Sequence, residues 1–115
     1  NAVVGIDATL QTAIIEMSSK GLSMVSIVDQ ANNLVGILTD GDLRRMLERG
    51  VDVYNENVKN VMTKSPKTIN SRELAVDALQ KMNEMHITSM PVLDDNQKVI
   101  GAILLQDIIK AGIVG

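Results

Sequence analysis

The sequence repeats itself once, with an offset of 65 residues and no gap. Identical residues recur at aligned positions, among them Ala13 and Ala78, Met17 and Met82, Asp29 and Asp94, Gly36 and Gly101, and Asp42 and Asp107. Apolar residues of similar size fill the positions between them. A fixed internal period is typical of a chain built from copies of one supersecondary unit, which cannot bury its apolar face alone. The repeat therefore predicts two equivalent units, stacked about a pseudo-twofold axis, that bury a shared core.

Each copy has the pattern of a helix, two strands and a second helix. Apolar residues at Leu10, Ala13, Ile14 and Met17 follow the i, i+3, i+4, i+7 spacing of an amphipathic helix, and the second copy repeats them. Asp7 and Ser71 are the expected N-caps of these first helices. Short apolar runs predict strands at 24–29, 34–39, 89–94 and 99–105, and second helices follow at 42–49 and 107–111.

The predicted fold class is α/β, with two β-α-β-β-α units. We expect the first unit at residues 1–50, a polar connector at 51–60 and the second unit at 61–115. The SPKTI segment that leads into the second unit contains Pro66 and should run extended. The first unit has no counterpart to this segment, so we expect its leading strand to be cut short.

Composition excludes several functions. Eleven basic and 14 acidic residues give a net charge of -3, and Tyr54 is the sole aromatic residue, so nucleic acid is a poor ligand. No apolar run is long enough to cross a membrane, and the opening residues NAVVGIDATL lack the basic, apolar and small-residue order of a signal peptide. The absence of cysteine and the single histidine, His86, rule out thiolate chemistry and a multi-histidine metal site. We expect a cytoplasmic protein.

The Thr-Asp-Gly-Asp run at 39–42 joins a predicted strand to a predicted helix. Its last aspartate recurs as Asp107, whereas the position of Thr39 becomes Leu104. Helix capping accounts for an aspartate in both copies, since a carboxylate in the first helical turn complements the helix dipole. It does not explain the extra hydroxyl. A hydroxyl and free N–H groups at a helix N-terminus suit a phosphate, and a carboxylate suits ribose hydroxyls, so the cluster indicates a nucleotide.

These residues resemble a known family. The G-x-x-T-x-x-D run at 36–42, the VMTKSPKTI segment at 61–69, the ITSMPVLD strand and the internal repeat are similar to a tandem pair of cystathionine-β-synthase (CBS) domains, the Bateman module. VGILTDGDLRR, LERGVD and the ending DIIKAGIVG resemble more narrowly the C-terminal CBS pair of bacterial arabinose 5-phosphate isomerases, which serve lipopolysaccharide (Kdo) synthesis. The resemblance implies a regulatory module without the catalytic isomerase domain, and therefore no enzyme activity in this chain.

CBS pairs have two symmetry-related nucleotide clefts. By that resemblance the first cleft has the ribose on Asp42, phosphate near Thr39, and the base against Ile37. The full set of implied nucleotide-binding residues is Ile37, Thr39, Asp40, Asp42, Pro66, Lys67, Thr68, Thr88, Ser89 and Gln106. The mirror cleft keeps Asp107 but offers Ala102 against the base and Leu104 for the hydroxyl, with only Asn1, Ala2 and Val3 as its wall. We therefore expect one competent site and a second, weaker cleft.

Alternatives stay open for several of these side chains. Asp40 and Asp42 could hold Mg²⁺, but without a third carboxylate no metal site is expected. Arg44, Arg45 and Lys67 are either a phosphate clamp or solvated surface charges, and His86 is either a ligand contact or an exposed loop residue.

Two functions follow from the sequence. One is a sensor of an adenosine or cytidine nucleotide (AMP, ATP or a CMP type) that regulates an attached sugar-isomerase domain; no cofactor is required. The other is a module that only dimerises and assembles the isomerase. In either case we expect a homodimer through the CBS pair, a tetrameric parent enzyme, and neither nucleic acid nor a membrane as a partner.

Overall fold

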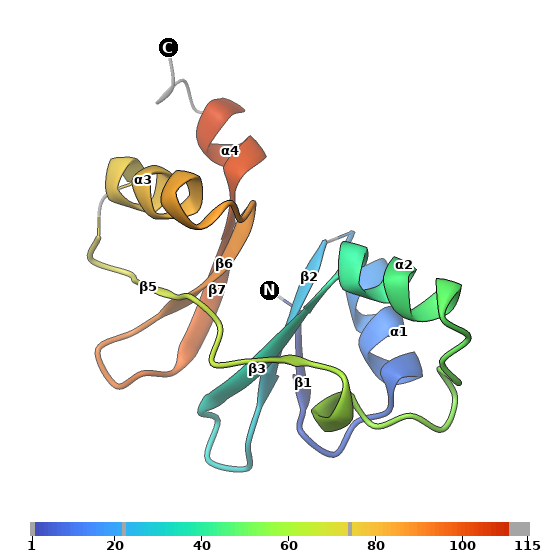
Figure 1. The fold of residues 1–115 in the computed structure, drawn as a ribbon. Helices are drawn as coiled ribbons and strands as arrows, with labels where there is room; N and C mark the ends of the chain where they lie inside the picture. Colours follow the sequence, from blue (N-terminus) through green and yellow to red (C-terminus); the bar gives the residue numbers. More distant parts are fainter. Residues whose placement is uncertain (1, 22, 74, 111–115) are drawn as a thin grey trace. The chain divides into compact units, whose positions relative to one another are not determined.

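The structure is a computed structural model that describes residues 2–21, 23–73 and 75–110, with side chains described through residue 109 (Figure 1). The chain divides into two units, Asn1–Pro66 and Lys67–Gly115. In each unit the helices pack on one face of a small sheet. None of the helices in the described ranges is long and apolar enough to cross a membrane.

The first unit contains a four-stranded sheet in the order β1-β2-β3-β4. Strand β1 is parallel to β2, and the β2/β3 and β3/β4 pairs are antiparallel. Its elements are β1 (Val3–Gly5), α1 (Leu10–Lys20), β2 (Met24–Val28), β3 (Leu34–Thr39), α2 (Asp40–Glu48), the 3-10 turn η1 (Val58–Asn60) and β4 (Thr63–Lys64).

The second unit repeats this arrangement with a three-stranded sheet in the order β5-β6-β7. Its elements are β5 (Ile69–Asn70), α3 (Ala75–Met85), β6 (Ser89–Leu93), β7 (Val99–Leu104) and α4 (Leu105–Lys110). Strand β5 is parallel to β6, and β6 is antiparallel to β7. The predicted α/β class and the β-α-β-β-α order of both units are confirmed.

The repeat extends to the turn between the two central strands of each unit. The Asp29 carboxylate accepts the backbone N–H of Asn33 at 2.9 Å, and the Asp94 carboxylate accepts that of Lys98 at 2.9 Å. Asn32 and Gln97, which are 65 residues apart, both have positive φ, at 68° and 66°. An aspartate that bonds its own turn fixes the strand reversal. Asp29 and Asp94, which occupy equivalent positions in the repeat, are therefore turn residues in their respective units.

Two predicted helix starts were misplaced. The N-cap of α1 is Thr9, whose hydroxyl accepts the backbone N–H of Thr12 at 3.3 Å, and not Asp7. Helix α3 begins at Ala75, four residues after Ser71. The leading strand of the first unit is also not cut short, because β1 pairs with β2 over three residues while β5 pairs with β6 over two. Residues 111–115, which include the end of the predicted last helix, lie outside the described residues.

The boundary between the units also differs from the predicted division into 1–50, 51–60 and 61–115. Residues 61–66 belong to the first unit, because β4 pairs with the edge of β3. The predicted connector packs onto that unit too: Val58 is fully buried in its core, and Val51 and Val53 lie against it. The segment 61–66, which was predicted to begin the second unit, thus completes the sheet of the first.

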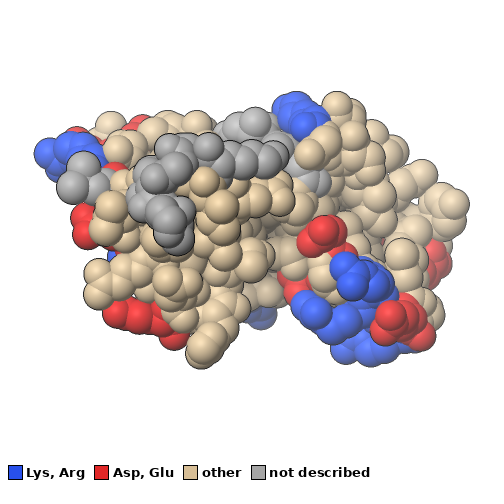
Figure 2. Space-filling view, turned by 90° about the horizontal axis from the view of Figure 1, so that it is seen from above, with Lys and Arg blue, Asp and Glu red and all other residues tan. Residues whose placement is uncertain are grey.

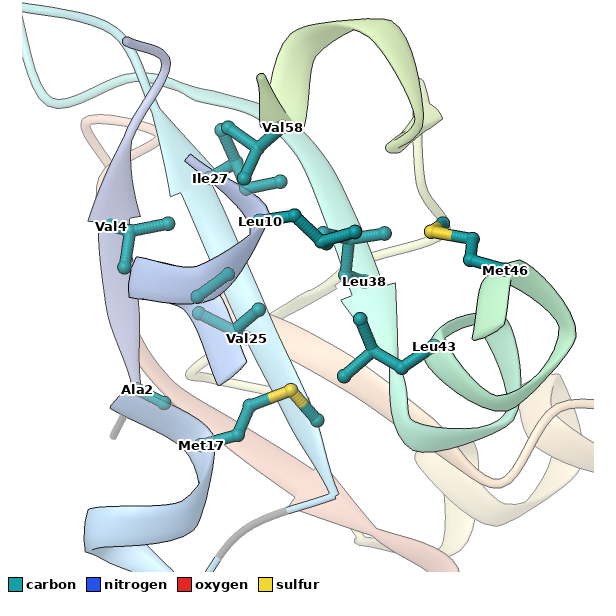
Figure 3. Packing of buried hydrophobic residues seen from close by; sticks show 11 residues of the cluster. Ala2, Val4, Leu10, Met17, Val25, Ile27, Leu38, Leu43, Met46 and Val58 are labelled. Carbon is teal, nitrogen blue, oxygen red and sulfur yellow. The ribbon is translucent and has the colours of Figure 1, made fainter. Parts of the chain in front are cut away.

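Each unit has its own cluster of buried apolar side chains. The first combines α1, β2, β3 and α2 with Val58, and Figure 3 shows Leu10, Ile27 and Leu38 converging between the sheet and helix α1. The second consists of Ile69, Ala78, Met82, Met90 and Ile108. Met17 and Met82, which are equivalent in the repeat, are both buried. The repeated helix pattern therefore marks the core-facing side of α1 and α3 correctly.

Candidate functional site

The strongest candidate site lies where β3 ends and α2 begins. Thr39 is the last residue of β3 and the N-cap of α2. Its hydroxyl accepts the backbone N–H of Asp42 at 3.2 Å, and the Asp42 carboxylate accepts the backbone N–H of Thr39 at 3.0 Å. This reciprocal pair is a capping box, which satisfies two backbone donors that a helix start leaves free. The T-x-x-D spacing at 39–42 produces it directly.

The hydroxyl of Thr39 therefore has a structural role in capping α2, which was not predicted from the sequence. Capping was taken to explain only the aspartate, whereas in the structure it uses both side chains. The two roles are compatible, because a hydroxyl that accepts a hydrogen bond from Asp42 can still donate its own proton. The Thr39 O–H thus remains available to a phosphate or ribose oxygen at the first turn of α2.

The second oxygen of Asp42 faces Arg45. The Arg45 guanidinium lies 2.5 Å from Asp42 Oδ1, and 20% of the Asp42 side chain is exposed compared with 65% of that of Arg45. The same guanidinium reaches back over the first turn, 3.5 Å from where a side chain on Gly41 would begin. Acidic and basic side chains mix on the face seen in Figure 2. Arg45 is thus the ion-pair partner of Asp42, and its guanidinium also lies beside the first turn of α2.

Strand β3 carries Ile37 on the same face as Thr39, since side chains alternate along a strand and Leu38 between them points into the core. Ile37 lies opposite Ser26 on β2 and opposite Thr63 on β4. Ser26 is 1% exposed and its hydroxyl has no hydrogen-bond partner. The sequence analysis missed Ser26; the signal was a single polar residue within the apolar run MVSIV.

The remaining predicted residues of unit 1 are Asp40, at the start of α2, and Pro66, two residues after the end of β4. Asp40 is exposed, and its carboxylate accepts the backbone N–H of Gly41 at 2.9 Å. Pro66 is half-buried and follows Ser65, which has φ of 50°. Because β4 is antiparallel to β3, with Thr63 opposite Ile37 and Lys64 opposite Gly36, the chain after Lys64 runs toward the start of β3 and away from Thr39. Ile37, Thr39, Asp40 and Asp42 are therefore brought together within one unit.

The residues predicted in the second unit form two groups. Thr88 accepts the backbone N–H of Leu105 at 2.9 Å through its carbonyl, and Ser89 pairs with Leu104. Thr88, Ser89 and Gln106 are thereby gathered where β6 begins and α4 starts. Lys67 is exposed and Thr68 half-buried just before β5.

Lys81 contacts the backbone of the second group, which consists of Lys67 and Thr68. Its ammonium donates to the Thr68 carbonyl at 3.3 Å and pairs with Glu73 at 3.2 Å. The backbone N–H of Asn70, and then Lys81, lower the pKa of Glu73 below its ordinary value. This network fixes the backbone that leads into β5, and the sequence analysis did not single it out.

The mirror position in the second unit is poorer in polar groups. Asp107 lies exposed in the first turn of α4, and Leu104, which precedes the helix, has no side-chain oxygen to form a capping box. Ala102 is exposed on β7. The two copies therefore differ at equivalent positions: the first has a hydroxyl before its second helix, and the second has an apolar side chain there.

Other candidates behave as surface or cap residues. His86 is exposed with φ of 57° at the end of α3, where its equivalent Gly21 has φ of 61° and caps α1. Arg44 is exposed. Within the described ranges, no three histidine, aspartate or glutamate side chains come together as a metal site would require.

The sequence matches known proteins along most of its length. The family described as CBS domain matches residues 2–49 and again residues 58–113. Arabinose 5-phosphate isomerase KdsD of Pseudomonas aeruginosa is 38% identical over 95% of this chain, and GutQ of Escherichia coli K12 is 39% identical over 96%. The chain spans 33% and 34% of the length of these two relatives.

Solved structures agree in fold. The CBS domain pair of protein MJ0100, in complex with 5′-methylthioadenosine and S-adenosyl-L-methionine, has a TM-score of 0.86 at 23% identity, over 96% of this chain and 90% of that one. The CBS domain protein PAE2072 of Pyrobaculum aerophilum, complexed with AMP, has a TM-score of 0.86 at 16% identity, over 93% and 82%.

Proposed function

The chain belongs to the CBS domain family, and from this premise we propose that it is the nucleotide-sensing regulatory module of an arabinose 5-phosphate isomerase of Kdo and lipopolysaccharide precursor synthesis. The homologous segments are parts of longer isomerases. In this proposal the chain itself has no catalytic role. It binds an adenosine or cytidine nucleotide and changes the activity of an attached sugar-isomerase domain in the cytoplasm. The module pairs as a homodimer within a tetrameric enzyme.

The observation that carries the proposal is the junction of β3 and α2. A carboxylate with 20% of its surface exposed, a hydroxyl with a free proton, and an arginine over a helix N-terminus lie within one turn. The carboxylate can accept two hydroxyl protons of a ribose. The helix N-terminus and Arg45 can take a phosphate oxygen. Ile37, on the same face, offers an apolar surface to the base.

The roles of the other predicted contacts follow the same scheme. Pro66, Lys67 and Thr68 present backbone groups to the edge of the base, and Lys81 holds the Thr68 carbonyl in place. Thr88, Ser89 and Gln106 supply polar contacts to the phosphate. The cleft of Asp107 and Ala102 lacks the hydroxyl, so we expect it to bind more weakly. Adenosine ligands in the structures of MJ0100 and PAE2072 support an adenosine nucleotide as the first candidate.

A second function is favoured by one observation. The capping box and the Arg45 ion pair use both oxygens of Asp42 inside the unit. A module that only dimerises and assembles the isomerase would need nothing more of these residues. The two functions differ in a simple way, because a sensor binds a nucleotide and an assembly module does not.

Isothermal titration calorimetry of the chain with AMP, ATP and CMP separates them. We expect one nucleotide per chain. Asp42→Ala should weaken binding by about 1.5–3 kcal/mol, the range for hydrogen bonds to a charged group, which is roughly a 10- to 150-fold loss. Asp107→Ala should change the affinity little, because Asp107 lies in the weaker cleft. Equal losses in the two variants would contradict a single competent site.

A matched control separates ligand binding from helix capping. Thr9→Ala removes the N-cap of α1, which lies away from the candidate site, whereas Thr39→Ala removes the N-cap of α2 within it. Both should lower the free energy of unfolding by about 0.5–2 kcal/mol. Only Thr39→Ala should also reduce nucleotide affinity. If none of the three nucleotides binds the unmodified chain, the assembly function is the better explanation.

A further inference from the structure

A proline lies in the middle of the central strand of the second sheet. Strand β6 has β5 on one side and β7 on the other, and Pro91 is its third residue. Its side chain is fully buried. Proline has no backbone N–H to donate to a ladder, and within sheets it is normally confined to edge strands, first residues and bulges. A proline at this position therefore calls for an explanation.

The first unit shows the hydrogen bond that Pro91 cannot make. Ser26 is the equivalent of Pro91, and its backbone N–H donates to the Ala2 carbonyl at 2.9 Å. Ala2 is in turn the equivalent of Lys67. In the second unit the Lys67 carbonyl has lost this donor, and within the described ranges no other donor replaces it.

The remainder of the parallel pairing agrees between the copies. The Ile6 N–H donates to the Val28 carbonyl at 2.8 Å, and the equivalent Ser71 N–H donates to the Leu93 carbonyl at 2.8 Å. The pairing of β1 with β2 nevertheless covers three residues, whereas that of β5 with β6 covers two. The difference between the units is therefore local to the position of the proline, and the register of the strands is the same.

The chain beside the Lys67 carbonyl is held in place although the carbonyl itself is open. The next carbonyl, that of Thr68, accepts a hydrogen bond from the Lys81 ammonium at 3.3 Å, and Lys81 also pairs with Glu73. Residue 81 is a glutamate in the other copy, Glu16, which has no proton to donate to a carbonyl when ionised. Lys67 is exposed. The second unit thus presents an accessible acceptor on a fixed backbone.

We propose that Pro91 is a specificity-determining residue, which leaves the Lys67 carbonyl open as the acceptor for the exocyclic amino group of a nucleobase. This inference rests on the proposed function, in which the backbone of residues 66–68 faces the edge of the base. A carbonyl oxygen accepts hydrogen bonds and cannot donate them, so it fits an amino group and repels an oxo group. The site therefore takes adenine or cytosine and rejects hypoxanthine or uracil.

Calorimetric titrations of the chain with AMP, IMP and ribose 5-phosphate test this assignment. AMP and IMP differ at the group that the carbonyl would contact, and ribose 5-phosphate has no base. We expect AMP to bind about tenfold or more tightly than IMP, the cost of facing one acceptor with another. If CMP proves to be the tighter ligand of the unmodified chain, CMP and UMP form the corresponding pair.

Pro91→Ser and Pro91→Ala both supply the missing N–H, and the first copies the residue of the other unit. The new N–H should bond to the Lys67 carbonyl, which slowed hydrogen exchange at residue 91 would report. AMP should then bind no more tightly than IMP, while the affinity for ribose 5-phosphate stays unchanged. A merely structural role of Pro91 would not change the preference between the two bases.

Val92→Ala is the matched control, because it removes apolar volume from the next residue of β6 and adds no N–H. It should retain the preference for AMP. If the Pro91 variants do not fold, Lys81→Met decides: it releases the Thr68 carbonyl and should reduce the preference, which Lys81→Arg should restore.

The outcomes distinguish this inference from the function on which it rests. Binding of none of the nucleotides by the unmodified chain would overturn both. Equal binding of AMP and IMP by that chain, an unprotected N–H at residue 91 in the variants, or a preference for AMP that survives Pro91→Ser would overturn the role of Pro91 alone. With unfolded Pro91 variants, an unchanged preference in Lys81→Met would do the same.

Discussion

Alanine at Gly36 should destabilise the protein, whereas alanine at the equivalent Gly101 should not. A Cβ on Gly36 would lie 2.8 Å from Met62 Cγ and 2.9 Å from the Thr63 carbonyl oxygen. The methionine can move, but the carbonyl is main chain within the β3/β4 pair and cannot move without breaking it. Overpacking of this kind costs about 1–3 kcal/mol.

The same substitution carries an opposing term. Replacing glycine by alanine reduces the conformational entropy of the unfolded chain, which stabilises the folded state by about 0.4–1 kcal/mol where the backbone conformation is compatible. At Gly36 this offsets part of the clash and leaves a net loss of about 1–2 kcal/mol. At Gly101, where nothing lies within 4 Å, the entropy term acts alone and should give a gain of up to about 1 kcal/mol.

Urea denaturation followed by circular dichroism measures both variants. The midpoint should fall for Gly36→Ala and rise slightly or stay constant for Gly101→Ala, with unchanged m-values. The loss of stability caused by Gly36→Ala should be smaller in a Met62→Ala background than in the unmodified protein, because the methionine side chain that meets the new Cβ is then absent. Equal effects at the two glycines would refute the argument that pairing with β4 distinguishes the surroundings of Gly36 on β3 from those of Gly101 on β7.

Three other changes test separate features. His86→Gly should raise the free energy of unfolding by about 1 kcal/mol, measured by urea denaturation, because His86 has φ of 57° at a helix end where its equivalent is a glycine. Leu10→Ala should lower it by about 2–5 kcal/mol in the same assay, since Leu10 is fully buried between α1 and the sheet. The lowered pKa of Glu73 means that its ionised form stabilises the folded state above pH 4.5, and this stabilisation is lost as the pH falls through the lowered pKa. Glu73→Gln should therefore reduce stability at about pH 7 and reduce it less at about pH 3, as measured by thermal unfolding at both pH values.

The internal repeat allowed the fold class to be predicted from sequence because it provides each pattern twice. Helix periodicity and the strand runs agree between the copies, and the bounds of β3, Leu34–Thr39, match the predicted strand. Residues with special backbone conformations also recur at the same offset, as Asn32 and Gln97 show. Where the two copies carry the same information, the local signal is reliable. The errors occur where the copies differ.

Two such differences explain what sequence reasoning missed. The N-cap of α1 was assigned to Asp7 because an aspartate is a strong cap, but Thr9 lies directly before the first helical residue and performs that role. Strand β4 was predicted to belong to the second unit because it lies in the VMTKSPKTI segment, which leads into that unit. Pairing between segments is a long-range property that local patterns do not encode. Gly36 was the available signal, since a glycine inside a strand marks a close approach by another backbone.

The asymmetry of the two copies decides how the candidate site should be understood. A capping box accounts for Thr39 and Asp42 by itself, so these residues alone do not require a ligand. The same capping need exists at α4, yet Leu104 stands where a hydroxyl could cap it. Stability therefore does not demand the hydroxyl at this position of the fold. We therefore propose that its presence in one copy, beside a partly exposed carboxylate and Arg45, serves a ligand that the first unit contacts, and the paired Thr9→Ala and Thr39→Ala titrations test this proposal directly.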